Sequence, residues 1–120
     1  MTISIRQEQN DAFAEAHYRG FESRAIRHLR RFFPDQVSRL SEDQKRALIA
    51  QMVSRARKYG LESEQAVMCF AHLPLLLGDD FDSNRRYQFA PRILKAQCGH
   101  AVERAKLAML LAYEFKKRGL

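Results

Sequence analysis

Apolar side chains recur every three or four residues along much of this 120-residue chain, which is the period of an amphipathic helix. The first such stripe is formed by Tyr18, Phe21, Ala25, Leu29 and Phe32. There is no run of alternating β-branched residues, and the chain holds only three prolines and five glycines. The pattern therefore predicts an all-α fold, a single-domain bundle of about five helices spanning residues 1–120.

Capping signals predict where helices begin. Ser4 with Gln7, and Ser41 with Gln44, have the spacing of a capping box, in which both side chains satisfy backbone N–H groups of the first turn. Ser63 is expected to cap a third helix through its hydroxyl. Three helix starts follow from these five residues.

Prolines and glycines predict where helices end. Pro34 is expected to close the first helix, because the residue before a proline is pushed out of the helical region. Gly60 suits the left-handed residue that ends the second helix, near Tyr59. Pro74 is expected to kink or break the third helix before Gly78.

The remaining part of the chain is expected to hold one loop and two helices. The main loop runs from Gly78 to Arg86 and is centred on Asp80. A short fourth helix follows, with Pro91 in its first turn. Gly99 then separates it from a last helix over about residues 100–118.

The distribution of charged and apolar residues indicates what the protein meets and where it is located. The net charge is +7, and it is arranged in blocks, with no Lys or Arg between Tyr59 and Asn84. Such blocks suggest a surface that meets a charged partner. The first residues lack the apolar core of a signal peptide, and no apolar run approaches the roughly 20 residues that span a bilayer. A cytoplasmic protein without a membrane segment is expected.

Two groups of residues invite a metal interpretation. Alternate loop positions hold Asp80, Asp82 and Asn84, as in a calcium-binding EF-hand. The glycine of such a loop would fall on Arg85 and its final glutamate on Pro91. We therefore favour a structural role, in which Phe81 packs the loop into the core and Asp82, Ser83 or Asn84 caps the following segment.

Cysteine and histidine could form the second metal site. Possible zinc ligands pair up as Cys69 with His72 and Cys98 with His100. Neither pair has a Cys-x-x-Cys knuckle, and a buried inert thiol is the ordinary state of Cys69 in its apolar stretch. His17 and His28 are interpreted as surface or partly buried structural residues. We expect no metal and no cofactor.

Catalytic motifs do not emerge from the sequence. It contains no Gly-x-Ser-x-Gly elbow and no glycine-rich phosphate loop. We therefore expect no enzymatic activity. A basic nucleic-acid-binding module is an alternative, because Arg24, Arg27 and Arg31 lie on the helix face opposite the first apolar stripe. No helix-turn-helix, zinc-finger or RNA-binding sheet signature accompanies that charge.

The last helix suggests a protein-binding surface. Residues 107–113 are apolar all round, whereas one alanine-rich face already suffices for packing. Leu107 and Leu110 are expected on the outer side, so the helix is either central in its domain or covered by another chain. These two leucines and the acidic pair Asp79–Asp80 are the candidate docking surfaces, and Arg24, Arg27 and Arg31 are further candidate partner-binding residues.

Several segments together resemble a family of small helical proteins found in bacterial type VI secretion gene clusters. They are Phe32-Phe33-Pro34, the helix end 54–60, the cap 61–64 and the loop 77–82, within a similarity that covers about residues 5–95. The resemblance implies a non-catalytic accessory role, such as an adaptor or chaperone for a secretion effector or spike component. An immunity protein that neutralises a neighbouring toxin is a further alternative.

Overall fold

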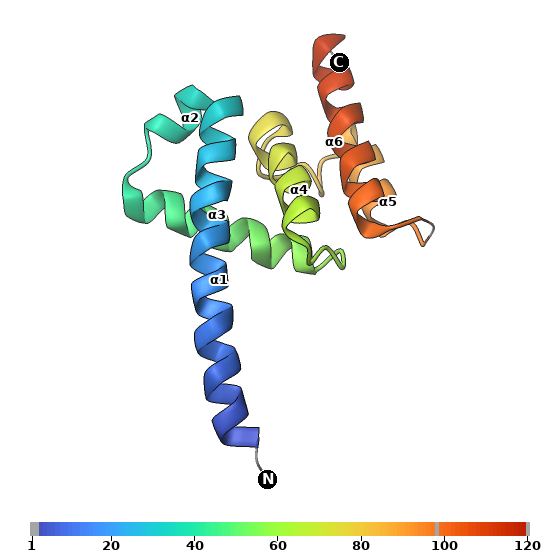
Figure 1. Ribbon diagram of the computed structural model, residues 1–120. Coiled ribbons are helices and arrows are strands. Elements are labelled where there is room, and N and C mark those ends of the chain that lie inside the picture. Colours follow the sequence, from blue (N-terminus) through green and yellow to red (C-terminus); the bar gives the residue numbers. More distant parts are fainter. Residues whose placement is uncertain (1–2, 98, 120) are drawn as a thin grey trace.

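The computed structural model describes residues 3–97 and 99–119, and side chains from residue 17 onward. In that part of the chain it holds six α-helices, one short 3-10 helix and no strand (Figure 1). The elements are α1 (Ile3–Phe32), α2 (Pro34–Ser38), α3 (Glu42–Arg57), α4 (Glu64–Leu77), the 3-10 helix η1 (Arg85–Tyr87), α5 (Phe89–Lys95) and α6 (Ala101–Lys117). The predicted all-α bundle is confirmed.

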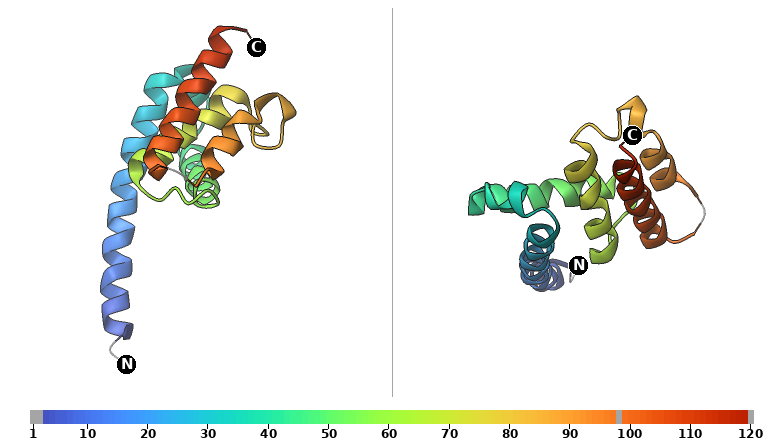
Figure 2. Two further views of the ribbon diagram at one scale, coloured as in Figure 1. Left: turned by 90° about the vertical axis from the view of Figure 1, so that its right-hand side faces the viewer. Right: turned by 90° about the horizontal axis from the view of Figure 1, so that it is seen from above.

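The helices form two layers. α1, α4 and α6 lie next to one another with α4 in the middle, while α3 crosses behind α1 and α4 and α5 packs behind α6 (Figure 1). The N-terminal half of α1 extends beyond the other helices (Figure 2). The capping box predicted from Ser4 and Gln7 falls on side chains outside the described ones.

The end of α1 follows the prediction from Pro34, and an additional helix begins there. Phe33 leaves the helical region, with φ −132° and ψ 59°. Pro34 then stands in the first turn of α2, where its missing N–H costs nothing. This five-residue helix was not predicted. Val37, which is fully buried, anchors it to the core.

The predicted caps of α3 and α4 are confirmed. The N–H of Gln44 donates to Ser41 Oγ at 3.2 Å, and the N–H of Ser41 donates to Gln44 Oε1 at 2.9 Å. Ser63 Oγ accepts from the N–H of Ala66 at 3.1 Å. Gly60 takes φ +73° at the end of α3, so that the buried Leu61 can fold back onto the helix.

The predicted break of the third helix is wrong, because α4 continues through Pro74 to Leu77. A kink at Pro74 stays a prediction. A proline inside a helix removes one backbone hydrogen bond, at a cost of about 3 kcal/mol. Pro74 still accepts from the N–H of Gly78 at 2.9 Å, and the side chains around it are buried. Core packing of Phe70 and Leu73 offsets the lost bond, and the helix ends only at Gly78.

Phe81 and Asn84 of the loop after α4 have the roles predicted for them. Phe81 is fully buried against Phe70, with ring centroids 5.8 Å apart. Asn84 caps η1, since its Oδ1 accepts from the N–H of Arg86 at 3.0 Å. The helix-cap interpretation is therefore confirmed for Asn84. Pro91 lies in the first turn of α5, also as predicted.

Candidate functional site

An open groove runs over α4 between α1 and α6, and we call it the α1–α4–α6 groove. Its volume is about 450 Å³. The α4 floor consists of Gln65, Met68, Cys69 and His72, and the walls consist of His28 and Phe32 of α1 and Lys106, Met109, Leu110 and Tyr113 of α6. The floor residues follow the spacing of one helix face, so the groove follows about two turns of α4.

Large apolar side chains stand open to solvent along both walls. Phe32 is 48% exposed on the α1 side, and Leu110 is 52% exposed on the α6 side. Met68 and Met109 are half-buried between them. A contiguous apolar surface of this kind is typical of a place where another molecule binds.

Three polar side chains form a hydrogen-bonded chain beneath this surface. His72 Nε2 lies 2.8 Å from His28 Nε2, and His72 Nδ1 lies 2.6 Å from the Tyr113 hydroxyl. The chain therefore ties α1, α4 and α6 together. His72 is only 2% exposed and is enclosed by the rings of Phe32 and Phe33, at 5.1 and 5.3 Å between centroids.

The environment keeps these three side chains uncharged near neutral pH. Burial lowers the pKa of His72 to about 4, with His28 as a smaller cause. Burial also lowers the pKa of His28, and the charge of Arg31 adds to that effect. A neutral imidazole offers one N–H and one bare nitrogen, which two histidines and a hydroxyl can satisfy in sequence. If both imidazoles were protonated, the Nε2–H groups of His28 and His72 would face each other and neither could accept a hydrogen bond.

The predicted docking leucines are both exposed, but they differ in position. Leu110 lines the groove, whereas Leu107, 48% exposed, lies outside it. Leu111, 39% exposed, faces the other side of α6, where it borders a depression of about 230 Å³ with Phe89 and Phe115. α6 lies at the edge of the bundle (Figure 1), so its apolar outer side is not explained by a central position.

The acidic loop is separate from the groove. The backbone carbonyl of Asp79 accepts from Arg55 Nη2 at 2.9 Å, and the Asp79 carboxylate lies 3.7 Å from Arg55 Nη1. The backbone carbonyl of Asp80 accepts from the N–H groups of Ser83 and Asn84. No residue of this loop is among those that line the groove. The two predicted docking surfaces are thus not one site.

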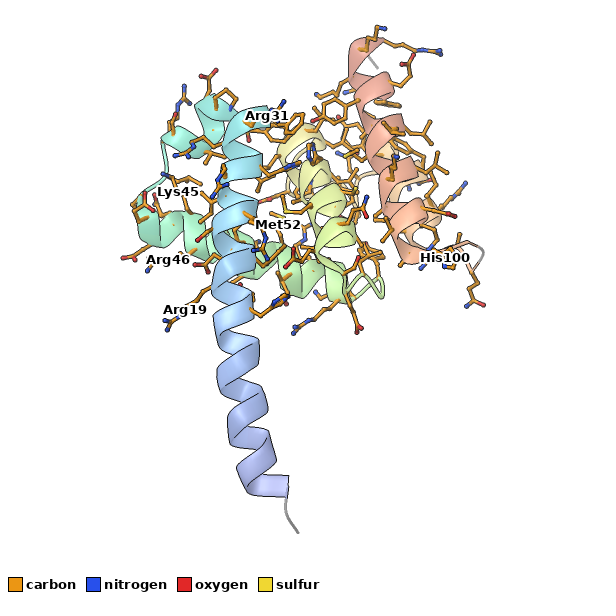
Figure 3. The ribbon with its side chains drawn as sticks, viewed as in Figure 1. Arg19, Arg31, Lys45, Arg46, Met52 and His100 are labelled. Atoms are coloured by element: carbon orange, nitrogen blue, oxygen red, sulfur yellow. The ribbon has the colours of Figure 1, made fainter. Side chains whose placement is uncertain are left out.

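The three predicted arginines are exposed on α1, but they are not equivalent. Arg24 forms an ion pair with Glu64, so its charge is already matched. The guanidinium of Arg31 lies 5.8 Å from the centroid of the Phe32 ring, near the C-terminal end of α1 (Figure 3). Arg31 therefore stands beside the groove. Arg27 is exposed on the same helix.

A wider cleft of about 730 Å³ separates α1 from α3 and the start of α4. Charged side chains of both signs line it, including Arg57, Glu62 and Glu64. Glu64 Oε1 lies 3.3 Å from His17 Nε2 and also pairs with Arg24. The mixed and paired charges give no preference for one class of ligand.

The residues considered for metal binding are dispersed in the described part of the chain. Cys69 has a free thiol whose pKa is raised by burial. His100 stands at the start of α6 (Figure 3), and Cys98 lies outside the described residues. Among residues 3–97 and 99–119, no three His, Cys, Asp or Glu side chains gather in a way that could hold a metal ion.

The hydrogen-bonded side chains of His28, His72 and Tyr113 were not predicted. One signal was present, since His72 stands in the strongly apolar stretch 67–77, where a polar group needs a hydrogen-bond partner. The partners themselves lie 44 and 41 residues away.

In the described part of the chain, no helix combines the length and the apolar character needed to cross a bilayer. Comparison of the chain with protein-family models, with curated proteins and with solved structures yields no match. The resemblance to accessory proteins of type VI secretion clusters stays a prediction.

Proposed function

We propose that this protein is a non-catalytic binding module that holds a segment of another protein in the α1–α4–α6 groove. The observation that carries the proposal is the exposed apolar surface formed by Phe32 and Leu110 on opposite walls of one groove. Burying such surface in a partner stabilises a complex by about 25 cal/mol per Å² before the costs of association.

The partner suggested by the sequence resemblance is a type VI secretion effector or spike component, which the protein would serve as an adaptor or chaperone in the cytoplasm. An immunity protein would use the same kind of surface against a toxin. A nucleic-acid-binding role fits the groove less well, because phosphates are bound by exposed cations rather than by an apolar trough.

Co-purification with the products of neighbouring genes tests the proposal. Leu110→Lys places a charge in the groove, whereas Leu111→Lys places the same charge on the other side of α6 and serves as the matched control. We expect the first variant to lose the partner at least tenfold and the second to retain it, with equal helicity by circular dichroism. Retention of the partner by Leu110→Lys would contradict the proposal.

A further inference from the structure

We infer that the occupant of the α1–α4–α6 groove is an amphipathic helix whose apolar stripe is flanked by acidic residues. The inference rests on the proposed function, since it names the chemistry of the segment that the groove would hold. Shape, lining and edge charge each support it separately.

The shape of the groove fits a helix. Its floor is one helix face, from Gln65 to His72, and its walls are the flanking helices α1 and α6. A helix laid over α4 would contact all three and complete a bundle by packing ridges into grooves. The seven helical steps from Gln65 to His72 measure about 10 Å at roughly 1.5 Å per residue. The partner would therefore present anchors at positions i, i+3 or i+4, and i+7.

The lining of the groove suits apolar anchors. His72 is neutral at pH 7 and has both ring nitrogens engaged by His28 and Tyr113. Met68 of α4 and Met109 of α6 both line the groove, and their unbranched side chains can adapt to varied apolar shapes. Apart from the exposed amide of Gln65, the floor thus offers contact area mainly to aliphatic side chains.

The edges of the groove select the charge of the partner. Lys106 is the one ionised side chain among its lining residues, and it is exposed on the α6 wall. Arg31 stands beside Phe32 on the α1 wall, close enough for its charge to lower the pKa of His28. No Asp or Glu lines the groove among the described residues. Cations on both edges favour acidic residues on either side of the apolar stripe.

Two labelled peptides of about 18 residues, carrying the same leucine stripe, provide the test. One has glutamates beside the stripe and the other has lysines, and a third peptide scrambles the order of the acidic one. Fluorescence anisotropy should show the acidic peptide binding at least tenfold more tightly than the lysine peptide and the scrambled peptide. The ratio of the affinities for the acidic and the lysine peptide should be smaller in Lys106→Glu than in the native chain, and it should fall as the salt concentration rises.

Methionine methyl resonances locate the bound peptide without any substitution. Met68 and Met109 line the groove, while Met52 is fully buried in the core and serves as the internal control. Saturation with the acidic peptide should shift the ¹³C-methyl signals of Met68 and Met109 and leave that of Met52 in place. Shifts absent from both groove methionines would overturn the inference even if the peptide bound.

Other outcomes separate this inference from the proposed function. If the scrambled or lysine peptide binds equally well, or if the acidic peptide does not bind at 100 µM, the acidic-helix inference is wrong. The proposed function would still stand if Leu110→Lys released a native protein partner. If sedimentation shows a dimer that Leu110→Lys dissociates, the occupant is a second copy of this chain, and the acidic-helix inference fails.

Discussion

Two polar clusters connect the helices, and they use opposite electrostatics. At the loop, the Arg55 guanidinium lies 3.4 Å from the Asp82 carboxylate, which also accepts a hydrogen bond from the Tyr59 hydroxyl at 3.1 Å. Beneath the groove, His28, His72 and Tyr113 are joined by hydrogen bonds without any charge at neutral pH. The first cluster is ionic and the second is neutral.

The difference follows from what surrounds each cluster. Asp82 and Asp79 keep contact with solvent, so the ionic cluster does not bear the full cost of burying charge. Arg55, whose side chain is 15% exposed, also lies over the rings of Phe70 and Phe81, at 5.9 and 5.3 Å from their centroids. A charge below the groove would lose solvation when an apolar ligand covered it, and neutral side chains avoid that cost.

The largest effect is expected from Arg55→Ala. This substitution removes the cation from Asp82 and from the two aromatic faces, and we expect a loss of about 3 kcal/mol in the free energy of unfolding. Urea denaturation measures it, with Lys58→Ala as the control at an exposed position three residues away. Equal stability of the two variants would show that the ionic cluster does not hold the loop.

Acid should weaken the neutral cluster. The folded-state pKa of His72 is about 4, below its ordinary value of 6.5, so between these values the unfolded chain binds a proton that the folded chain does not. The contribution to stability is complete above pH 6.5 and is lost as the pH falls towards 4. The loss should reach about 2 kcal/mol by pH 4.5.

Comparing the native chain with His72→Phe measures the pH-dependent contribution of His72 together with its contact to His28, because all other titrating groups remain in both proteins. The free energy of unfolding should fall more steeply with acid in the native chain than in the variant. Parallel pH profiles between 7 and 4.5 would mean that His72 titrates normally. The conclusion that the groove floor is neutral would then rest on the hydrogen bonds alone.

The smallest effect is expected from Tyr113→Phe, which deletes one oxygen. His72 Nδ1 would lose its partner while staying buried, at a cost of about 1 to 2 kcal/mol. Thermal melts of the variant and the native chain measure the difference. An unchanged melting temperature would show that the hydroxyl does not stabilise the chain of three residues.

The sequence by itself determined the elements whose ends are set by neighbouring residues. Ser41 with Gln44, Ser63 and Gly60 act within a few residues of their partners, so their spacing alone predicted the caps of α3 and α4. The fold class follows from the same local signals. So does the burial of Phe81, which lies between turn residues in an otherwise polar loop.

Tertiary packing decided the features that depend on distant segments. It carried α4 through Pro74, formed α2 around the buried Val37, and left α6 at the edge of the bundle with Leu110 exposed. These outcomes depend on which faces meet, and a helix that is apolar all round does not specify which of its sides will be covered.

The groove also depends on segments that are distant in the sequence. Its floor and walls come from α1, α4 and α6. The hydrogen bonds beneath it join His72 to His28, which is 44 positions away in the sequence, and to Tyr113, which is 41 positions away. Helical periodicity fixes the spacing of side chains within each of these helices, but not the register between them. That register is set by the close packing of the shared core, so only the folded bundle places His28, His72 and Tyr113 in contact.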